Sequence, residues 1–334
     1  MADDDVPLVV FLIVICSAFV HASWNLATRA IKGDLAVLAS SCCFGAILLS
    51  PALFFVSYDN NNLGMGILFG IISGIVHIVY VAFVGLMYAH TSGNVSTVYP
   101  VARGSGVCLT AIFAGPVLGE TISLLGFFGI LTILLGIALM ASAKFLQRKE
   151  TTKTIIENSK TCTNPMTSET VNLPKENEKL EALPEENCFT KNRRFGAIFL
   201  SLILGCIISS YSLIDKVGVG YINPVAYIWI MEVTETCFFV PYFLLYEKNR
   251  NMLLKAFREK KKYIAIVSVF KSGCYLMVLY ALTISKASYI TALRECSVVF
   301  GAILGFIVLK ESINYVMVFG ILSIVAGLVM IKLA

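Results

Sequence analysis

The sequence predicts an all-α, polytopic membrane protein with ten transmembrane helices in two inverted five-helix repeats. Three observations predict this fold class. Hydrophobic residues make up 57% of the 334 positions and charged residues only 14%, whereas soluble domains carry about 25% charged residues. The apolar residues come in blocks of about 20, the length of one helical crossing of a bilayer. The last five blocks repeat the first five. Lipid offers no partner for backbone N–H and C=O groups, so such blocks must be helices.

The blocks divide the chain into three parts. The first repeat, residues 1–145, holds predicted helices at 7–29, 35–57, 64–88, 94–117 and 122–145. Residues 146–194 are rich in Glu, Lys, Asn and Thr and lack apolar periodicity, which predicts a charged, disordered linker. The second repeat, residues 195–334, holds predicted helices at 195–215, 222–246, 262–284, 287–309 and 312–332.

The repeat is visible at single positions. Arg103 returns as Arg294 and Gly136 as Gly327, both at an offset of 191 residues. Each half crosses the bilayer five times, an odd number, so consecutive halves must insert with opposite orientation. This inverted-repeat design is typical of secondary transporters, in which the solute site lies near the midplane between the repeats.

Charged side chains at bilayer depth are costly and usually functional. Arg103 and Arg294 lie near the middles of their predicted helices, at matching places in the repeats, and Tyr99 precedes Arg103 by one turn. Two guanidinium groups suit a carboxylate or a phosphate. The alternative is that each arginine pairs internally, Arg294 with Glu295 or with a glutamate of the helix at 222–246, and only holds helices together.

A second charged group is expected to serve ion coupling. Glu232 and Glu235 are three residues apart and therefore share a helix face. Buried carboxylates can load and release protons, so this pair is a candidate proton-coupling device. A fixed salt bridge to Lys271 on the following helix is the alternative. The ten cysteines contain no CxxC pair and are interpreted as small packing residues.

Further polar and aromatic side chains are candidates for binding the solute. His21 and Asn25 share a face near the end of the first helix, with Trp24 as a wall. Anchoring of the tryptophan at the headgroup level is the alternative. The three histidines are dispersed, so no metal site is predicted. The remaining candidates are His77, Tyr80 and Tyr275. For Tyr275, core packing is favoured over a role as an aromatic wall of the site.

Composition and motifs also exclude function classes. The net charge of +5 is small and comes from loops, and no nucleic-acid-binding signature is present. HExxH, GxSxG and paired aspartates at helical spacing are absent from the sequence, so neither an enzyme nor a cofactor is predicted. The expected partners are the lipid bilayer and a small-molecule solute, and a homodimer stays open. Basic residues concentrate at 29–32, in the linker and at 248–262. With ten crossings, all three stretches lie on the side opposite the termini. The positive-inside rule places these stretches in the cytoplasm and therefore both termini outside.

Two stretches resemble a known family. The glycine and glutamate pattern at the start of the fifth and tenth helices resembles the closing signature of an EamA-type repeat in the drug/metabolite transporter superfamily, and the stretch His21–Asn25 resembles the helix 1 motif of some of its branches. The residues of the signature are Gly119, Glu120, Gly126, Gly129 and Gly136, and again Lys310, Glu311, Gly320 and Gly327.

The resemblance implies ten helices, an inverted repeat and alternating access around a central cavity lined by helices 1, 3, 4, 6, 8 and 9. It implies carriage of amino acids, sugars, nucleotide-linked metabolites or other organic solutes. It also implies cytoplasmic termini, contrary to the charge pattern.

We therefore expect a multi-pass protein of the plasma membrane or an internal membrane. Its expected function is secondary transport of a small polar organic metabolite, by exchange or by coupling to protons. A cation channel or carrier on the same scaffold is the alternative, with Glu232, Glu235 and Glu295 as its acidic lining. A non-transporting membrane scaffold is a weaker alternative, because a scaffold has no reason to keep buried charges.

Overall fold

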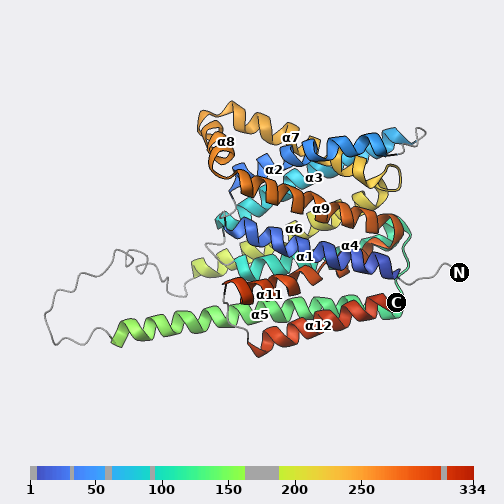
Figure 1. Cartoon of the computed structure of the whole chain (residues 1–334). Helices are drawn as coiled ribbons and strands as arrows, with labels where there is room; N and C mark the ends of the chain where they lie inside the picture. Colours follow the sequence, from blue (N-terminus) through green and yellow to red (C-terminus); the bar gives the residue numbers. More distant parts are fainter. Residues whose placement is uncertain (1–5, 31–33, 57–61, 91–94, 162–187, 310–313) are drawn as a thin grey trace.

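The computed structural model describes residues 6–30, 34–56, 62–90, 95–161, 188–309 and 314–334. Over these ranges ten segments are helical, long and apolar enough to cross a membrane. The ten predicted crossings are therefore confirmed. The helices lie side by side, with both termini at one end of the bundle and α8 at the other (Figure 1).

The first half contains α1 (Leu8–Ala30), α2 (Leu35–Leu49), the 3₁₀ segment η1 (Ser50–Phe55), α3 (Leu63–His90), α4 (Val95–Leu118) and α5 (Leu124–Thr161). The second half contains α6 (Cys188–Gly218), α7 (Pro224–Leu245), α8 (Glu247–Glu259), α9 (Lys261–Ile284), α10 (Ala287–Leu293), α11 (Cys296–Leu309) and α12 (Tyr315–Lys332).

Three segments differ from the sequence-based expectation. The ninth crossing is interrupted at 294–295 and forms two helices, α10 and α11. The basic stretch at 248–262 was expected to be a loop, but it forms α8 because its apolar positions pack on one side against α2, α7 and α9. Within the expected linker, α5 continues to Thr161 and α6 already begins at Cys188, while residues 162–187 lie outside the described part.

Local sequence signals explain where several helices begin. The Asp34 carboxylate accepts a hydrogen bond from Ala36 N at 3.0 Å and caps α2. The side chain of Asn223 caps α7 in the same way, and Asn314 caps α12. Such side chains satisfy backbone N–H groups that have no partner within the helix. α2 gives way to η1 next to Pro51, which cannot donate a backbone hydrogen bond.

The packing of helices from different halves shows a two-fold pattern. Exchange of the halves maps α1 onto α6, α2 onto α7, α3 onto α9, and α4 onto α10 and α11. α1 packs on α9 and α11, and correspondingly α6 packs on α3 and α4. α2 packs on α9 as α7 packs on α3, while α2–α7 and α5–α12 pair with their own counterparts. The repeat seen in the sequence is thus a repeat in space.

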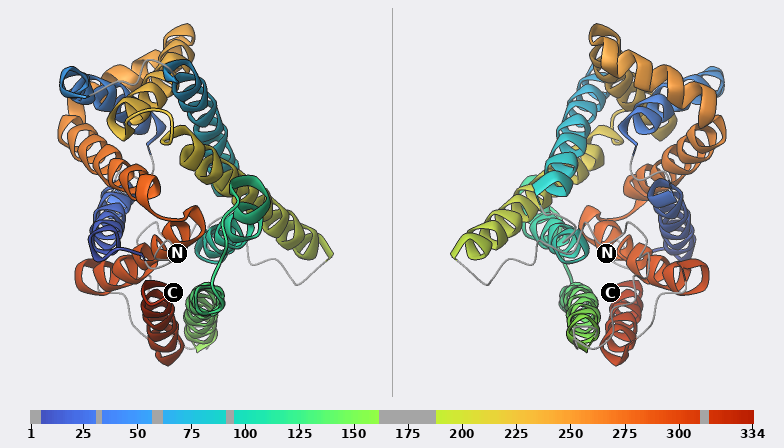
Figure 2. Two further views of the ribbon diagram at one scale, coloured as in Figure 1. Left: turned by 90° about the vertical axis from the view of Figure 1, so that its right-hand side faces the viewer. Right: turned by 90° about the vertical axis from the view of Figure 1, so that its left-hand side faces the viewer.

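Each half contributes to two mixed walls. Seen along the helices, α1, α9 and α11 form one wall and α6, α3 and α4 form the other (Figure 2). The pair α5–α12 lies at one edge of the bundle, and α2, α7 and α8 lie at the opposite edge. We call α1, α9 and α11 the α1 wall, and we call α6, α3 and α4 the α6 wall. A side-chain contact between the walls joins the two repeats when its partners come from different halves of the chain.

Glycines allow α5 and α12 to approach closely. A Cβ at Gly136 would lie 2.7 Å from Gly320 O, and a Cβ at Gly327 would lie 2.6 Å from Gly129 O. Helices in lipid associate largely through such close backbone packing. This close packing explains the glycines of the repeated signature, since a larger residue would separate α5 and α12.

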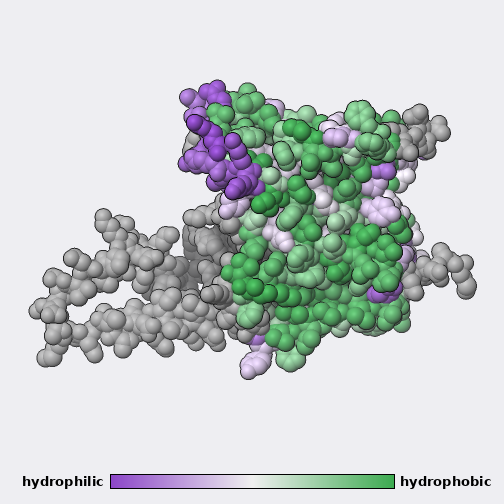
Figure 3. All heavy atoms as spheres, in the orientation of Figure 1, coloured by the Kyte–Doolittle hydropathy of each residue, from purple (hydrophilic) through white to green (hydrophobic). Residues whose placement is uncertain are grey.

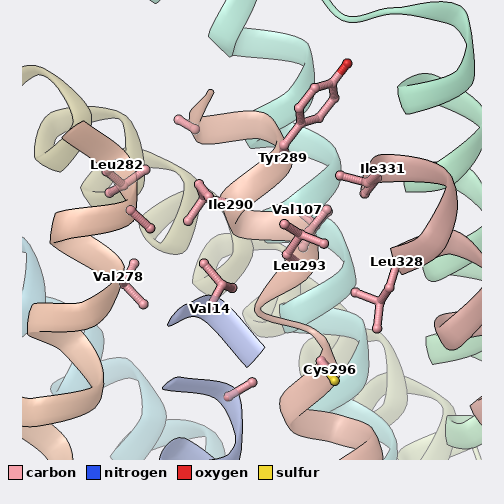
Figure 4. Packing of buried hydrophobic residues seen from close by; sticks show 14 of the residues in the cluster. Val14, Val107, Val278, Leu282, Tyr289, Ile290, Leu293, Cys296, Leu328 and Ile331 are labelled. Carbon is pink, nitrogen blue, oxygen red and sulfur yellow. The ribbon is translucent and has the colours of Figure 1, made fainter. Parts of the chain in front are cut away.

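The core and the outer surface are both apolar, as expected in lipid. The core cluster draws residues from both halves, including Val14, Val107, Leu293 and Ile331 (Figure 4). Outward-facing side chains over the spans are largely hydrophobic, and a strongly hydrophilic patch covers α8 (Figure 3). Exposed apolar surface of this extent is unfavourable in water and suits a bilayer.

Candidate solute site

A buried ion pair joins the two walls. Arg103 on α4 contacts Glu295, at the break before α11, with Nη2 2.8 Å from Oε1 and Nε donating to Oε2 at 3.3 Å. Nη2 also donates to Ser297 Oγ at 3.4 Å. The two charged side chains are only 6% and 3% exposed. The internal pairing left open by the sequence is thus present for Arg103, with its partner from the other repeat.

Arg294 has a different environment from its repeat counterpart. It lies at the α10–α11 break, where the backbone makes tight bonds such as Ser297 N to Arg294 O at 3.0 Å. Its guanidinium carbon lies 5.5 Å from the ring centre of Tyr275, a cation–π contact. The side chain is half-buried, and it forms no ion pair with any residue in the described ranges. Its charge is therefore available to an anionic group.

Asp215 on α6 gathers hydroxyl groups from three other helices. Ser73 Oγ donates to Oδ1 at 2.5 Å, Tyr227 OH donates to the same oxygen at 3.0 Å, and Tyr275 OH donates to Oδ2. The aspartate is 1% exposed. Tyr275 thus contacts Arg294 with its ring and Asp215 with its hydroxyl, so one side chain links a cation of the α1 wall to an anion of the α6 wall.

His77 and Tyr80 extend this polar centre along α3. The ring of His77 lies 4.4 Å from that of Tyr211 and 5.3 Å from that of Tyr275, centre to centre. Its Nδ1 lies 2.9 Å from Ser73 O. Tyr80 packs edge-on against Tyr211. Both predicted residues are half-buried, and His77 reaches Asp215 through Ser73. Tyr99 falls among residues whose side chains are not described.

A second charged cluster lies between α2, α7 and α9. Lys271 Nζ is 2.7 Å from Glu235 Oε2 and 3.7 Å from Glu232 Oε1. Ser272 Oγ donates to Glu232 Oε1 at 2.7 Å. Cys42 donates to Glu235 at 3.0 Å and lies 3.1 Å from Lys271 Nζ. The salt bridge to Lys271 therefore exists, and Cys42 does more than pack, contrary to the sequence-based interpretation.

The same cluster contains ligand atoms for a metal ion and a carboxylate that can take up a proton. One ligand atom each of Cys42, Glu232 and Glu235 lies within 4.8 Å of the others, a spacing that a metal ion could use. The Lys271 ammonium already supplies positive charge there. Glu232 Oε2 is buried and has no hydrogen-bond partner among the described residues. The cluster therefore contains one carboxylate oxygen that is free to take a proton.

The α1 candidates form their own small group. Trp24 Nε1 donates to His21 Nδ1 at 3.2 Å, so the neutral ring carries its proton on Nε2. That nitrogen is buried and has no partner within the described part of the chain. Trp24 and Asn25 are half-buried. The tryptophan thus holds the His21 ring in one orientation.

With the geometry in place, comparison with known proteins identifies the family. The model of the EamA-like transporter family matches residues 8–142 and 195–333. The chain belongs to this family. One EamA-type repeat therefore covers each half, and the protein is a multi-pass membrane protein of a transporter family. A search of curated proteins finds no significant match.

The EamA-like fold is also found among solved structures. One crystal structure matches 97% of this chain and 98% of its own length, with a TM-score of 0.63 and 12% sequence identity. At that identity the likeness concerns the fold alone. It nevertheless extends over both repeats, and so it agrees with the two-repeat architecture of the family.

The structure gives the EamA signature in the first repeat a physical role. Glu120 precedes α5 and accepts hydrogen bonds at the start of α10, from Ala287 N at 2.6 Å and Ser288 N at 3.1 Å. A carboxylate at a helix N-terminus satisfies free N–H groups and complements the helix dipole. Gly119 has φ of 68°, a conformation that favours glycine. Through Glu120, the signature of the first EamA repeat therefore forms hydrogen bonds to the second repeat.

Sequence reasoning missed Asp215, the centre of the most highly connected polar group. The predicted helix ended at 215, which placed this aspartate at a helix terminus. In the structure α6 continues to Gly218, and Lys216 fixes its end by donating to Leu282 O at 2.6 Å. An aspartate within an apolar helix was the available signal. The partners Ser73 and Tyr227 carry no comparable signal.

Proposed function

We propose that this EamA-like protein is a secondary transporter that carries a small polar organic solute with an anionic group, bound between the α1 wall and the α6 wall. The observation that carries the proposal is the state of Arg294. This guanidinium lies at a helix break between the repeats, is half-buried, and has no carboxylate partner among the described residues. A carboxylate or phosphate of the solute would form the ion pair that Arg294 lacks.

The two repeat-related arginines then have separate roles. Arg103 is neutralised by Glu295 and acts between the walls, so it is a positioning residue. Arg294 is the contact for the anionic group, and Tyr275 holds it in place through the cation–π contact. His21, whose Nε2–H lacks a partner in the described region, can donate a further hydrogen bond to the solute. These donors suit a compact, polar molecule.

The polar contacts that cross between the walls support a mechanism of alternating access. Arg103–Glu295 joins α4 to the break before α11, and Tyr275–Asp215 joins α9 to α6. The first contact joins the two repeats, and the second joins the two walls within the second repeat. A solute bound to Arg294 lies beside Tyr275, whose ring contacts Arg294 and whose hydroxyl contacts Asp215, and so its binding shifts the balance between two packings of the walls.

Coupling to protons is assigned to the cluster around Lys271. Glu232 and Glu235 together carry two negative charges when ionised, against the single positive charge of Lys271. An unbalanced charge in this buried place is costly. A proton on the unpartnered Glu232 Oε2 removes the imbalance. Glu232 is therefore the proposed proton carrier, with Glu235 and Lys271 as a fixed pair.

The cation channel receives less support from the same contacts. Glu295 is bound by Arg103 and Glu235 by Lys271, so two of the three carboxylates in the supposed acidic lining are already neutralised. A charge-neutralising scan separates the two functions. An anion carrier fails when Arg294 is replaced, whereas a cation path fails when the glutamates are replaced.

The test is uptake into proteoliposomes from a mixed pool of small metabolites, with and without a pH gradient. The wild type should accumulate or exchange at least one anionic solute, and Arg294→Gln should abolish this uptake. Glu232→Gln should keep solute exchange but lose the response to the pH gradient. Lys255→Gln, which changes one charge on exposed α8, is the matched control and should behave as the wild type. Wild-type vesicles that take up no solute would contradict the proposal.

A further inference from the structure

The helix α8 has an unusual position and charge. Among the described helices it alone lies in none of the ten candidate spans, and it connects the ends of α7 and α9. Residues 247–262 contain seven basic and two acidic side chains, a surplus of five, which equals the net charge of the whole chain. Figure 3 shows this hydrophilic patch at the edge of a largely apolar surface.

Aromatic residues place α8 at the membrane boundary. Tyr246 directly precedes α8 and is 60% exposed, while Tyr242 on α7 and Tyr263 on α9 are also exposed. Exposed tyrosines at the ends of spans mark the headgroup level of a bilayer. Because α8 lies between the ends of two spans that carry such tyrosines, it lies in the plane of the headgroups.

The faces of α8 differ in a way that suits a phospholipid. Ala256 is buried against the bundle and Leu253 packs beside it. Leu254 and Phe257 stay exposed at 55% and 43%. At about 100° per residue, Arg250 and Leu254 are one turn apart, as are Leu254 and Arg258, so an exposed apolar stripe runs between two arginines.

Most of the positive charge on this surface is uncompensated. Lys260 pairs with Asp34 at 2.6 Å, and Lys255 approaches Glu259 at 4.0 Å. Arg250, Arg258 and the neighbouring Lys261 form no ion pair with residues that the structure describes. The described part of the chain therefore offers these three side chains no partner of opposite charge.

From these observations we infer that the Arg250–Leu254–Phe257–Arg258 surface of α8 binds an anionic phospholipid. The phosphate and the acidic headgroup contact the two arginines, and an acyl chain packs on Leu254 and Phe257. Apolar side chains flanked by basic ones suit the boundary between acyl chains and headgroups, and basic residues next to a span attract anionic lipid. This lipid site lies apart from the proposed solute site between the walls.

Native mass spectrometry of the purified, delipidated full-length chain tests the inference. The probes are phosphatidylserine and phosphatidylcholine with the same acyl chains. The wild type should bind phosphatidylserine more tightly. Arg250→Gln and Arg258→Gln should each lower this preference about 5-fold, and the double variant about 25-fold. Glycerophosphoserine, which has the headgroup without acyl chains, should not compete.

Two further variants separate the site from general charge. Lys255→Gln removes the same charge from the same helix, about 100° around from Leu254, and should leave the preference within 2-fold. Leu254→Asn combined with Phe257→Asn should weaken both lipids alike. The inference is overturned if the double arginine variant keeps the wild-type preference, or if Lys255→Gln loses as much. Size-exclusion profiles and circular dichroism check that each variant is folded.

Discussion

The ion pair between Arg103 and Glu295 should be one of the strongest energetic links between the two repeats. Both side chains are almost fully buried, and the contact uses two guanidinium nitrogens and both carboxylate oxygens. Removal of one partner leaves an unpaired buried charge, which typically costs about 3–5 kcal/mol. We therefore expect Arg103→Gln and Glu295→Gln each to lower the free energy of unfolding by about this amount.

A double-mutant cycle measures this link. The double variant Arg103→Gln/Glu295→Gln leaves no unpaired charge, so it should cost clearly less than the two single changes together, with a coupling of about 2–3 kcal/mol. The assay is equilibrium unfolding of purified protein in mixed micelles. The matched control is the exposed pair Lys255–Glu259, whose 4.0 Å contact should give a coupling below about 0.5 kcal/mol. Additive effects at Arg103 and Glu295 would refute the reasoning.

Two other predictions concern stability and use the same assay. Tyr275→Phe removes one of the three hydroxyl donors to Asp215 and should cost about 1–3 kcal/mol, whereas Tyr242→Phe on the exposed surface should change nothing. Gly136→Ala places a Cβ 2.7 Å from a backbone oxygen of α12 and should cost about 1–3 kcal/mol. Gly273→Ala meets no atom within 4 Å and should have no such cost, so equal losses in the two glycine variants would contradict the packing argument.

The fold was predictable because lipid allows few solutions. Apolar blocks of spanning length must be helices, and an odd number of them in each repeat must invert the second half. α8 could not be found in this way, because its helix depends on the packing of Leu253 and Ala256 against neighbouring spans. The break at 294–295 was likewise invisible, since Pro and Gly, the usual signals, are absent from Arg294 and Glu295.

The charged residues of the candidate site could be predicted from the sequence, but the residues that pair with them could not. Burial cost alone singled out Arg103, Arg294 and Glu232. Which carboxylate neutralises which arginine depends on the relative positions of α4 and α11, which no local pattern encodes. The sequence left Arg294 paired with its neighbour Glu295 as an option, yet adjacent residues on a helix point in different directions. Glu295 instead reaches Arg103.

The orientation of the chain also depends on α8. The basic surplus of residues 247–262 lies at the end of the bundle opposite the termini (Figure 1). Anionic phospholipid is concentrated in cytoplasmic leaflets, so the lipid inference and the positive-inside rule favour the same placement. The family resemblance implies the reverse. Protease accessibility of tags on the two termini in sealed vesicles decides between them.

Solute-dependent unfolding is the most direct test of a solute site at Arg294. A ligand present at 100 times its Kd stabilises the folded state by about 2.7 kcal/mol. Among small organic anions screened against the purified protein, at least one should raise the unfolding free energy of the wild type by this amount, and the increase should vanish in Arg294→Gln and persist in Lys255→Gln. Equal stabilisation of wild type and Arg294→Gln would place the solute elsewhere and contradict the assignment.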